Sequence, residues 1–409
     1  MNRVGIEKLN IYGCSMFVDQ RKLALARDKD PQKVIDDYLI ETRSLNPLWE
    51  DTVTMGANAA KPMLEGVDTD RIGMLIAGTE GAVDFGKPIS TNLIGALGLN
   101  KNIRNYEVKH ACYSGLAALD TAVNWVASGL NGGRTALVIA ADFSREHLNL
   151  KEEFVLGGVG AALLISNNPE IVEFEPQRKG TWSIDVYDTW RPSALGEVGN
   201  NEVSLYSYMD ALEGAWEDYT KRAGSEADFD RDHRWLCYHT PFPGMAFQAH
   251  RTLCNLNSPR KKAEVQDDFR KRVLPVLRYS KRMGSTYGSS NFVGTASLLS
   301  GDAPVKSGDR IGYYAYGSGA IGEFWSGRVL DGASKRMQAM NIDGKLDCRR
   351  EASVQEYEEV DTKRSESIEQ ENYVPDRNFP SGLWDNNYQG KDLLTLAKID
   401  GFVRHYEWS

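Results

Sequence analysis

The sequence predicts an α/β fold with mainly parallel central sheets, built from two similar halves. Three observations carry this prediction: short apolar runs that end in small residues, a helical segment that is apolar nearly all round, and the return of the same alternation in the second half of the chain. Alternating strands and helices are typical of parallel sheets, because each parallel connection needs a crossover. The expected halves are residues 1–170 and 171–409.

The first half supplies buried strands and one central helix. Residues 72–79, 136–143 and 160–166 have the composition of strands that are covered on both faces. Between the first two runs, residues 115–127 are apolar nearly all round, so we expect this helix inside the protein rather than on its surface. The N-terminal residues also read as a strand.

The second half repeats this pattern. Residues 235–239 read as the end of a strand, residues 292–299 as a buried helix and residues 310–315 as a further strand. The stretch 351–371 is polar and rich in acidic residues, and we expect an exposed helix and loop there. The two halves match in pattern only, so the duplication is an expectation from the order of elements.

Composition excludes several classes of function. The 409 residues carry a formal net charge of -9, which argues against nucleic acid as a partner because a basic surface is expected there. No run of about 18 apolar residues occurs, so no membrane span is expected. The five cysteines are scattered and form no C-x-x-C pair. We therefore expect neither a zinc site nor a disulfide framework, and a cytoplasmic location.

Cys112 is the first candidate for chemistry. It stands in the sequence HACYSGLAAL, at the junction between a strand and the buried helix. The unpaired N–H groups and the positive dipole end of a helix N-terminus lower the pKa of a thiol and favour the nucleophilic thiolate. A buried structural cysteine is the alternative that the local pattern leaves open.

Glu80 is the second candidate, in the loop GTEGAVDFGKPIS that follows the first apolar run. Such a loop lies at the carboxyl edge of a sheet, where ligands bind in α/β folds. A glutamate among small residues can act as a general base. Taken alone, the position fits a solvated loop carboxylate better.

His239 is the third candidate, in Tyr238-His239-Thr240-Pro241 at a strand end. An imidazole there can orient or protonate a thioester carbonyl, although a lone histidine beside a proline turn is more often structural. His250, further along the chain, is expected on the surface of a helix.

Glycine-rich turns form a fourth group, at residues 157–160, 283–285 and 316–319. Glycine permits close backbone approach, and such turns can direct N–H groups at an oxyanion. None of them has the spacing of a dinucleotide-binding loop or a P-loop, and each alone is only a turn.

Residues 259–282 form a basic run in an acidic chain. The run holds nine basic and three acidic residues, a local charge of +6. Such a patch suits an acidic carrier protein or the phosphates of coenzyme A. A solvated helix with alternating charges explains the run equally well.

Three of these motifs, in this order, resemble the 3-hydroxy-3-methylglutaryl (HMG) synthase family. The Glu in GTEGAVDFGKP, the Cys in ACYSG and the His in YHTPF are similar to the family's catalytic residues. The resemblance therefore implies catalytic roles for Glu80, Cys112 and His239. The segments YDTWRP and YGSG also resemble family segments, and the likeness weakens beyond residue 340.

The resemblance implies a thiolase-like fold, a homodimer and an acyltransferase that needs neither a metal nor a redox cofactor. Cys112 would take an acetyl group, Glu80 would remove a proton from its methyl group, and the carbanion would attack the β-ketone of an acceptor thioester held by His239. Water would then release the product. The resemblance further implies substrate-binding roles for Tyr113, Asp188, Ser285, Tyr287, Asn291 and Ser318.

Within the family, the segments VGIEKLNIYG, NAAKPML and DFGKPIST are similar to the enzymes that introduce β-branches in polyketide pathways. This likeness implies donor and acceptor acyl carrier proteins as partners, with the acyl groups on phosphopantetheine, or on coenzyme A. The basic run would dock the carrier through Arg260, Lys261, Lys262 and Lys271. One departure is Ser285, where the family commonly has an Asn that holds the acceptor; Asn291 is the expected substitute.

Three alternatives stay open. Two are enzymes, a primary-metabolism HMG-CoA synthase and an initiating ketoacyl synthase, and the third is a non-catalytic subunit that binds a carrier protein. The sequence lacks the His-Gln-Ala-Asn element of ketoacyl synthases. The presence of all three catalytic residue types argues against a non-catalytic subunit.

Overall fold

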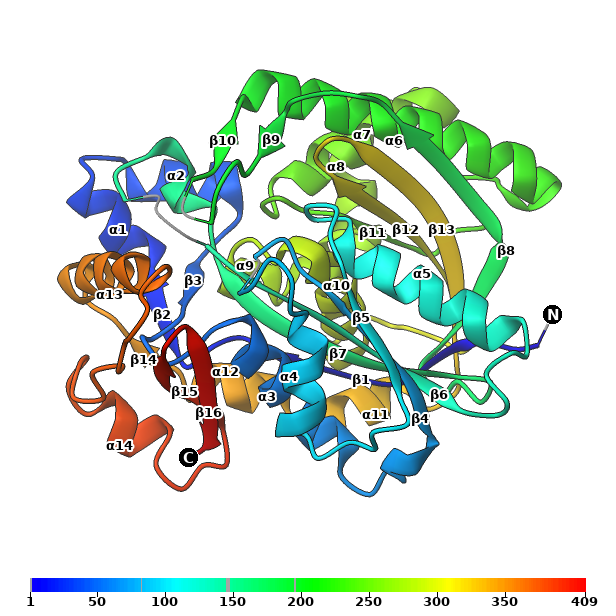
Figure 1. The fold of residues 1–409 in the computed structure, drawn as a ribbon. Coiled ribbons are helices and arrows are strands. Elements are labelled where there is room, and N and C mark those ends of the chain that lie inside the picture. The colour runs from blue at the N-terminus through cyan, green and yellow to red at the C-terminus, as the bar shows by residue number, and fades with distance from the viewer. Residues whose placement is uncertain (1, 82, 145–147, 195) are drawn as a thin grey trace.

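One nine-stranded sheet runs through the protein (Figure 1). The computed structural model describes residues 2–81, 83–144, 148–194 and 196–409. From one edge of the sheet to the other, the strands are β11 (Trp235–Tyr238), β12 (Arg310–Gly317), β13 (Ile321–Val329), β8 (Val172–Ser183), β1 (Gly5–Tyr12), β7 (Gly158–Ser166), β6 (Thr135–Phe143), β4 (Ile72–Gly78) and β5 (Arg104–Val108).

The sheet is mixed, so the prediction of mainly parallel sheets is wrong. β11 lies parallel to β12, and β4 lies parallel to both β5 and β6, whereas the other five neighbouring pairs are antiparallel. The error has a physical reason. A strand that is covered on both faces is a continuous apolar run whichever way it points, so β7 reads like a parallel strand. The α/β class itself is confirmed.

Two groups of four strands follow the same pattern. In the order β4-β6-β7-β1, the pairings are parallel, antiparallel and antiparallel, and β11-β12-β13-β8 repeats that series. The groups meet where Gly5 pairs with Glu173 and Ile6 with Val172. This repetition is what a duplication divided near residue 170 would produce, and the division itself stays a prediction.

Two helices, α5 (Ser114–Ala127) and α10 (Ser290–Ser300), lie between the two groups of strands (Figure 1). Their apolar side chains share one buried cluster with strands of both groups, which confirms the predicted central helices. The outer face of the first group is covered by α3 (Thr52–Leu64) and α4 (Ile89–Ala96). The outer face of the second is covered by α6 (Asn201–Ala223), α7 (Met245–Asn257) and α8 (Lys262–Arg272).

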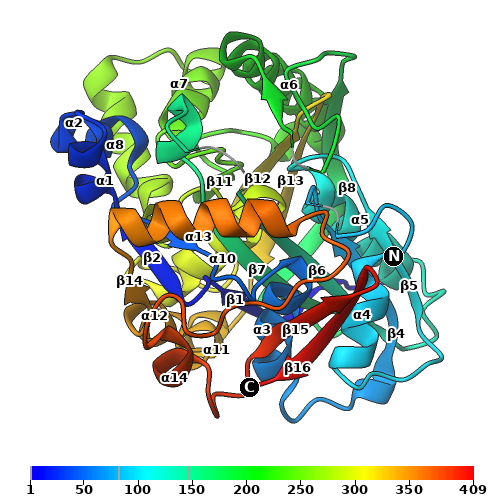
Figure 2. The same cartoon turned by 60° about the vertical axis from the view of Figure 1, so that its left-hand side comes forward.

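The C-terminal part of the chain returns to the first half (Figure 2). The hairpin of β15 (Leu394–Asp400) and β16 (Val403–Trp408) packs on α3, where the Asn58 side chain bonds both backbone groups of Leu394. Helix α13 (Val354–Ser367) was expected to be exposed, but it buries Tyr357 and Val360. Its polar composition hides that buried face.

The remaining elements are short. None of the described helices is long and apolar enough to cross a membrane. The elements not yet named are α1 (Gln20–Ala26), α2 (Pro31–Tyr38), α9 (Ser280–Met283), α11 (Ala333–Ala339), α12 (Ile342–Asp347), α14 (Leu383–Asn387), the three-stranded sheet of β14 (Arg350–Glu351), β2 (Met16–Asp19) and β3 (Thr42–Leu45), and the paired strands β9 (Thr189–Trp190) and β10 (Val198–Gly199).

Candidate active site

The candidate nucleophile, Cys112, lies in a tight turn just before α5. The turn starts after β5 and includes Ala111 with a φ of 41°, a left-handed conformation that is strained for a residue with a side chain. The strain holds the backbone in a sharp bend, so that the sulfur stands at the start of the central helix. Cys112 is partly exposed, as a residue that meets a substrate must be.

The start of α5 touches the start of α10 through two glycines. A Cβ atom on Gly115 would lie 2.1 Å from the carbonyl oxygen of Gly288. No side chain fits in that space, so glycine is what allows the backbones to approach. Tyr287 therefore lies beside the turn that carries Cys112.

The structure brings Cys112 and Glu80 together. Glu80 follows the end of β4, and the Cys112 thiol donates a hydrogen bond to its Oε1 across 3.2 Å. Burial raises the pKa of Glu80 to about 7; the Arg191 charge opposes this shift, and the Asp142 and Glu197 charges add to it. A carboxylate with a pKa near 7 can both accept and return a proton at neutral pH.

The predicted lowering of the Cys112 pKa is wrong. Burial and the neighbouring Glu80 carboxylate raise the pKa of Cys112 well above its usual value. The helix N-terminus still faces the sulfur, but a negative charge at hydrogen-bond distance disfavours a thiolate. The resting pair is therefore a thiol and a carboxylate that share a proton, not a free thiolate.

Asp142, at the end of β6, was not found from the sequence. Its Oδ1 accepts hydrogen bonds from Thr79 Oγ1 at 2.6 Å, from Glu80 N at 2.9 Å and from Gly81 N at 3.2 Å. These bonds fix the loop that carries Glu80. Burial raises the pKa of Asp142 to about 6, although these donors oppose the shift. The sequence feature that could have identified Asp142 is a carboxylate at the end of an otherwise apolar strand.

Arg191 and Glu197 are two further charges near Glu80. Arg191 donates to Glu197 Oε2 from Nε at 2.8 Å and from Nη2 at 2.7 Å. Although burial opposes it, the charges of Glu80 and Glu197 raise the pKa of Arg191. Arg191 belongs to the segment YDTWRP, but only its aspartate was singled out from the sequence.

His239 follows β11 and is fixed through its backbone. Its N–H donates to the Tyr314 carbonyl at 2.6 Å, and its own carbonyl accepts from Tyr208 at 2.7 Å. The imidazole lies beside the rings of Tyr208 and Tyr316, each at 6.4 Å between centroids, and these two rings contact each other at 5.2 Å. Its Nε2 is buried and has no hydrogen-bond partner among the described residues.

Burial lowers the pKa of His239 to about 3. The imidazole is therefore neutral throughout the physiological pH range. A neutral imidazole with a free Nε2 can donate one hydrogen bond to a substrate oxygen without adding a charge.

Asp188 anchors the β9–β10 hairpin to the turn between β12 and β13. Its carboxylate is fully buried and accepts from the Tyr316 hydroxyl at 2.7 Å and from Gly319 N at 2.9 Å. Both oxygens are occupied, so the structure gives Asp188 an anchoring role in place of the substrate contact expected from the sequence. Ser318, in the same turn, has its backbone bonded to the side chain of His110, close to the nucleophile.

Tyr287 lies at the site as expected. Its φ is 46°, and its buried hydroxyl has no hydrogen-bond partner among the described residues. Its pKa is raised by burial and by the charges of Glu197 and Glu80. Ser285 is buried beside it, with its backbone N–H bonded to the Val155 carbonyl at 2.9 Å.

Two expected substrate contacts have other partners. The amide nitrogen of Asn291 donates to the carbonyls of Cys237 at 2.9 Å and Tyr314 at 3.1 Å, so it ties α10 to the ends of β11 and β12. Asn291 was expected to take the place of the family Asn that holds the acceptor. Its amide nitrogen already donates to these two carbonyls, so it is not free to bind a substrate. The Tyr113 hydroxyl donates to Glu323 at 2.6 Å, and the ring belongs to the buried cluster around α5.

Most of the basic run is neutralised by acidic residues from other segments. Arg260 pairs with Asp230 at 2.7 Å, and the further pairs join Arg272 to Asp230, Arg278 to Asp343, Lys281 to Glu41 and Arg282 to Asp347. These carboxylates are distant in the sequence, so the local charge counted from the sequence is larger than the charge that the folded surface presents. Lys261, Lys262 and Lys271 are exposed and have no acidic partner among the described residues.

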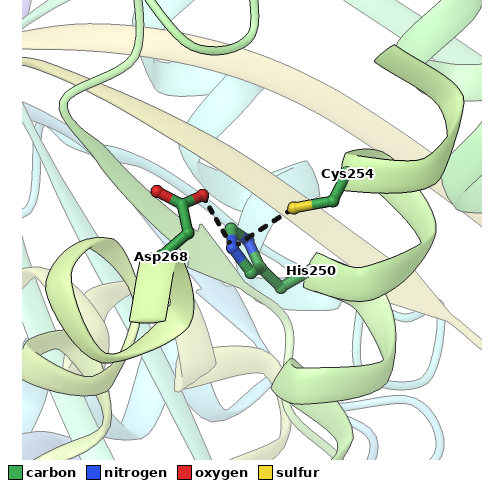
Figure 3. A group of neighbouring side chains, drawn as sticks. All are labelled: His250, Cys254 and Asp268. Carbon is green, nitrogen blue, oxygen red and sulfur yellow. Dashed lines mark hydrogen bonds and ion pairs between the residues drawn. The ribbon is translucent and has the colours of Figure 1, made fainter. Parts of the chain in front are cut away.

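A second cluster of titratable side chains joins α7 to α8 (Figure 3). His250 Nε2 lies 3.0 Å from Asp268 Oδ2 and 3.5 Å from Cys254 Sγ. Both His250 and Cys254 are fully buried, so the prediction that His250 lies on the surface is wrong. The buried face of α7 is not visible in its mixed local composition.

The same cluster has the atom types of a metal site, but its charges are already compensated. Arg272 lies 2.9 Å and Arg260 lies 3.6 Å from the Asp268 carboxylate. Although burial opposes it, His250 and Arg272 lower the pKa of Asp268 to about 2. A cation there would face two guanidinium groups, so we interpret the cluster as a network that holds α7 against α8.

Comparison with known proteins agrees with this geometry. Two family models match the chain: "Hydroxymethylglutaryl-coenzyme A synthase N terminal" over residues 1–169 and "Hydroxymethylglutaryl-coenzyme A synthase C terminal" over residues 244–406. The chain is 36% identical, over the full length of both proteins, to the polyketide biosynthesis 3-hydroxy-3-methylglutaryl-ACP synthase PksG of Bacillus subtilis. It is 32% identical to the hydroxymethylglutaryl-CoA synthase of Enterococcus faecalis, over 90% of this chain and 95% of that one.

Solved structures give the same result. The HMG synthase of the curacin biosynthetic pathway superposes over the whole of both chains with a TM-score of 0.95 and 35% identity, and it has also been solved with its donor ACP. The structure of PksG superposes with a TM-score of 0.94, over 99% of each chain at 36% identity. These matches confirm the predicted thiolase-like fold and the predicted resemblance.

Proposed function

Since the chain belongs to the hydroxymethylglutaryl-coenzyme A synthase family, we propose that it joins an acetyl group on Cys112 to the β-ketone of a carrier-bound β-ketoacyl thioester. The product is a β-hydroxy acyl chain with a β-carboxymethyl branch. What supports a carrier protein over coenzyme A is the full-length likeness to relatives whose names or titles include ACP. The observation that carries the chemistry is the 3.2 Å contact between the Cys112 thiol and the Glu80 carboxylate.

In the first step Glu80 accepts the thiol proton of Cys112 across their hydrogen bond. The sulfur attacks the carbonyl carbon of the donor thioester, a new carbon–sulfur bond forms, and the carrier thiol leaves. The proton passes from Glu80 to that leaving thiol. Glu80 is then a carboxylate again, beside an acetyl group on Cys112.

In the second step Glu80 removes a proton from the acetyl methyl group. Burial favours this role, because it raises the pKa of Glu80 to about 7 and so makes the carboxylate a stronger base than a solvated one. The enolate oxygen needs preorganised donors. Backbone N–H groups at the start of α5 and in the turn at Ser318 are the candidate donors, and the bond between His110 and the Ser318 backbone supports this assignment for the turn.

In the third step the carbanion attacks the acceptor ketone, and Glu80 returns its proton to the alkoxide. His239 holds the ketone oxygen through Nε2, which is buried and without a partner among the described residues. Its neutral state lets it donate this hydrogen bond without adding a charge to the site. Water then cleaves the Cys112 thioester and releases the carboxylate and the thiol.

Carrier docking is assigned to Lys261, Lys262 and Lys271, which are exposed on and before α8. Arg260 contributes charge to this surface, but Asp230 and Asp268 hold its guanidinium. We also propose that the enzyme is a cytoplasmic homodimer that accepts both a donor and an acceptor carrier, with acyl groups on phosphopantetheine and no metal or redox cofactor.

Intact mass spectrometry tests the proposal. Incubation with acetyl-loaded carrier protein should add one acetyl group, about 42 Da, and Cys112→Ala should abolish the gain. Cys348→Ala is the matched control, because that cysteine is exposed and remote from the assigned chemistry. Acetylation that persists in Cys112→Ala would show that Cys112 is not the nucleophile. Equal acetylation by acetyl-coenzyme A would favour the coenzyme A-dependent reaction.

A further inference from the structure

The β9–β10 hairpin is pinned at its base and carries two charges on its loop. Thr189 and Trp190 pair with Gly199 and Val198, and Asn200 N donates to the Asp188 carbonyl at 2.8 Å. Since Asp188 is itself held by the turn between β12 and β13, the base of the hairpin has a fixed position.

The loop of this hairpin reaches the Glu80 loop. Ala194 lines the same cavity, of about 110 Å³, as Val83 and Phe85 of the Glu80 loop. Arg191 and Glu197 stand at the two ends of the hairpin loop. Among the described residues, the charged and titratable groups that interact electrostatically with Glu80 are Cys112 before α5, Asp142 from β6, Tyr287 before α10, and Arg191 and Glu197 from the hairpin.

The geometry of the pair explains why Arg191 does not neutralise Glu80. A guanidinium near a buried carboxylate forms a strong ion pair, which would occupy the oxygen lone pairs that a base needs. Glu197 Oε2 instead accepts from both Nε and Nη2 of Arg191, at 2.8 and 2.7 Å. The side chains are 17% and 24% exposed, so solvent screens this competition only partly.

We propose that Arg191 and Glu197 are opposed positioning residues for Glu80: Arg191 supplies the counter-charge that keeps a buried carboxylate ionisable, and Glu197 restrains Arg191 from pairing with it. This inference rests on the proposed role of Glu80 as the base. Neither residue touches the reacting atoms. Together they set how readily Glu80 takes a proton from the acetyl group.

The two residues should act in opposite directions. Glu197→Gln releases Arg191 towards Glu80, so the carboxylate stays ionised to lower pH but becomes a weaker base. Arg191→Gln removes the counter-charge, so Glu80 stays protonated to higher pH. Each shift should be about one pH unit, which is about tenfold in rate at a fixed pH on the acidic limb.

Hydrogen exchange on the acetyl-enzyme measures this directly. The enzyme is acetylated on Cys112, transferred to deuterated buffer, and the mass of the Cys112 peptide is followed over a range of pH. The exchange reports removal of methyl protons and needs no acceptor. Glu80→Gln should accept the acetyl group only slowly, because it lacks the base for the Cys112 thiol, and once acetylated over a longer incubation it should show no exchange. Exchange that persists in acetylated Glu80→Gln would refute the proposed base instead.

The expected result is a lower midpoint for Glu197→Gln, a higher one for Arg191→Gln, and a midpoint near wild type in the double variant. Arg191→Lys, which keeps the charge, should restore much of the wild-type profile. Glu202→Gln, at the exposed start of α6, is the matched control and should leave the midpoint unchanged.

Structural damage would give a different pattern. Two damaging substitutions add, whereas two opposed charges cancel. Midpoints of Glu197→Gln and Arg191→Gln that coincide with wild type would overturn the inference while leaving the proposed base intact, and so would shifts of these two variants in the same direction. If one glutamine variant does not fold, the other still decides by the direction of its shift, because the inference requires a lower midpoint for Glu197→Gln and a higher one for Arg191→Gln.

Discussion

The contact between the two central helices gives a prediction whose size follows from the structure. Gly115→Ala adds a Cβ atom 2.1 Å from the Gly288 carbonyl oxygen and 3.2 Å from the Ala140 Cβ. The first distance is far below an ordinary non-bonded contact, so the two helix starts must separate by roughly 1 Å or more. Cys112 and Tyr287 lie on either side of this contact, so their spacing must change.

We expect both acetylation and condensation to fall about 100-fold, because a misplacement of about 1 Å at reacting groups has that effect. Overpacking should also lower the free energy of unfolding by about 1–3 kcal/mol. Intact mass spectrometry measures acetylation, product formation from pre-acetylated enzyme measures condensation, and thermal unfolding measures stability.

Gly95→Ala is the matched control. Gly95 lies in α4, and a Cβ atom there would meet nothing within 4 Å. That change should stabilise the protein by about 0.5–1 kcal/mol, since alanine favours a helix, and leave activity unchanged. Wild-type rates and stability in Gly115→Ala would refute the reasoning, because they would mean that the helix starts separate without moving the site.

Three further outcomes follow from the charges at the site. Condensation by pre-acetylated enzyme should rise with pH through about 7, because only ionised Glu80 accepts a proton; a midpoint near 4.5 would show a solvated carboxylate. Asp142→Asn should move that midpoint down, since the Asp142 charge raises the pKa of Glu80, and an upward move would contradict this. Exchanging Lys261, Lys262 and Lys271 for Glu should slow acetylation by the carrier and flatten its salt dependence, but leave acetylation by a small thioester almost unchanged; equal loss with both donors would indicate a damaged fold.

The sequence was sufficient to predict the strands and helices that a local pattern of apolar residues determines. Buried strands and the two central helices were visible as apolar runs of the right length. Glu80 and His239 stand where such a run ends, and Cys112 stands just before one begins. The direction of β7 was not visible, because burial on both faces removes the alternation that marks an antiparallel strand with one solvent-exposed face. Strand direction is decided by connections and packing.

Electrostatic features were the least predictable. The sequence shows that the run is basic, but it does not show that Asp230, Glu41 and Asp343, which are distant in the sequence, form ion pairs with it. Asp142 and Glu197 were missed for the same reason. Each becomes relevant only when the fold brings its carboxylate beside the Glu80 loop, and no local spacing encodes that contact.

The contact between Cys112 and Glu80 shows why a rule about one residue fails at a site made of two. A helix N-terminus favours a thiolate, but a carboxylate at 3.2 Å favours the thiol by more, and burial strengthens that preference. The thiol is not disabled, because the group that raises its pKa is also the base that receives its proton. Once the acetyl group replaces that proton, the same carboxylate is free and faces the methyl group. One buried glutamate can thus serve both half-reactions, with the Arg191–Glu197 pair keeping it free to do so.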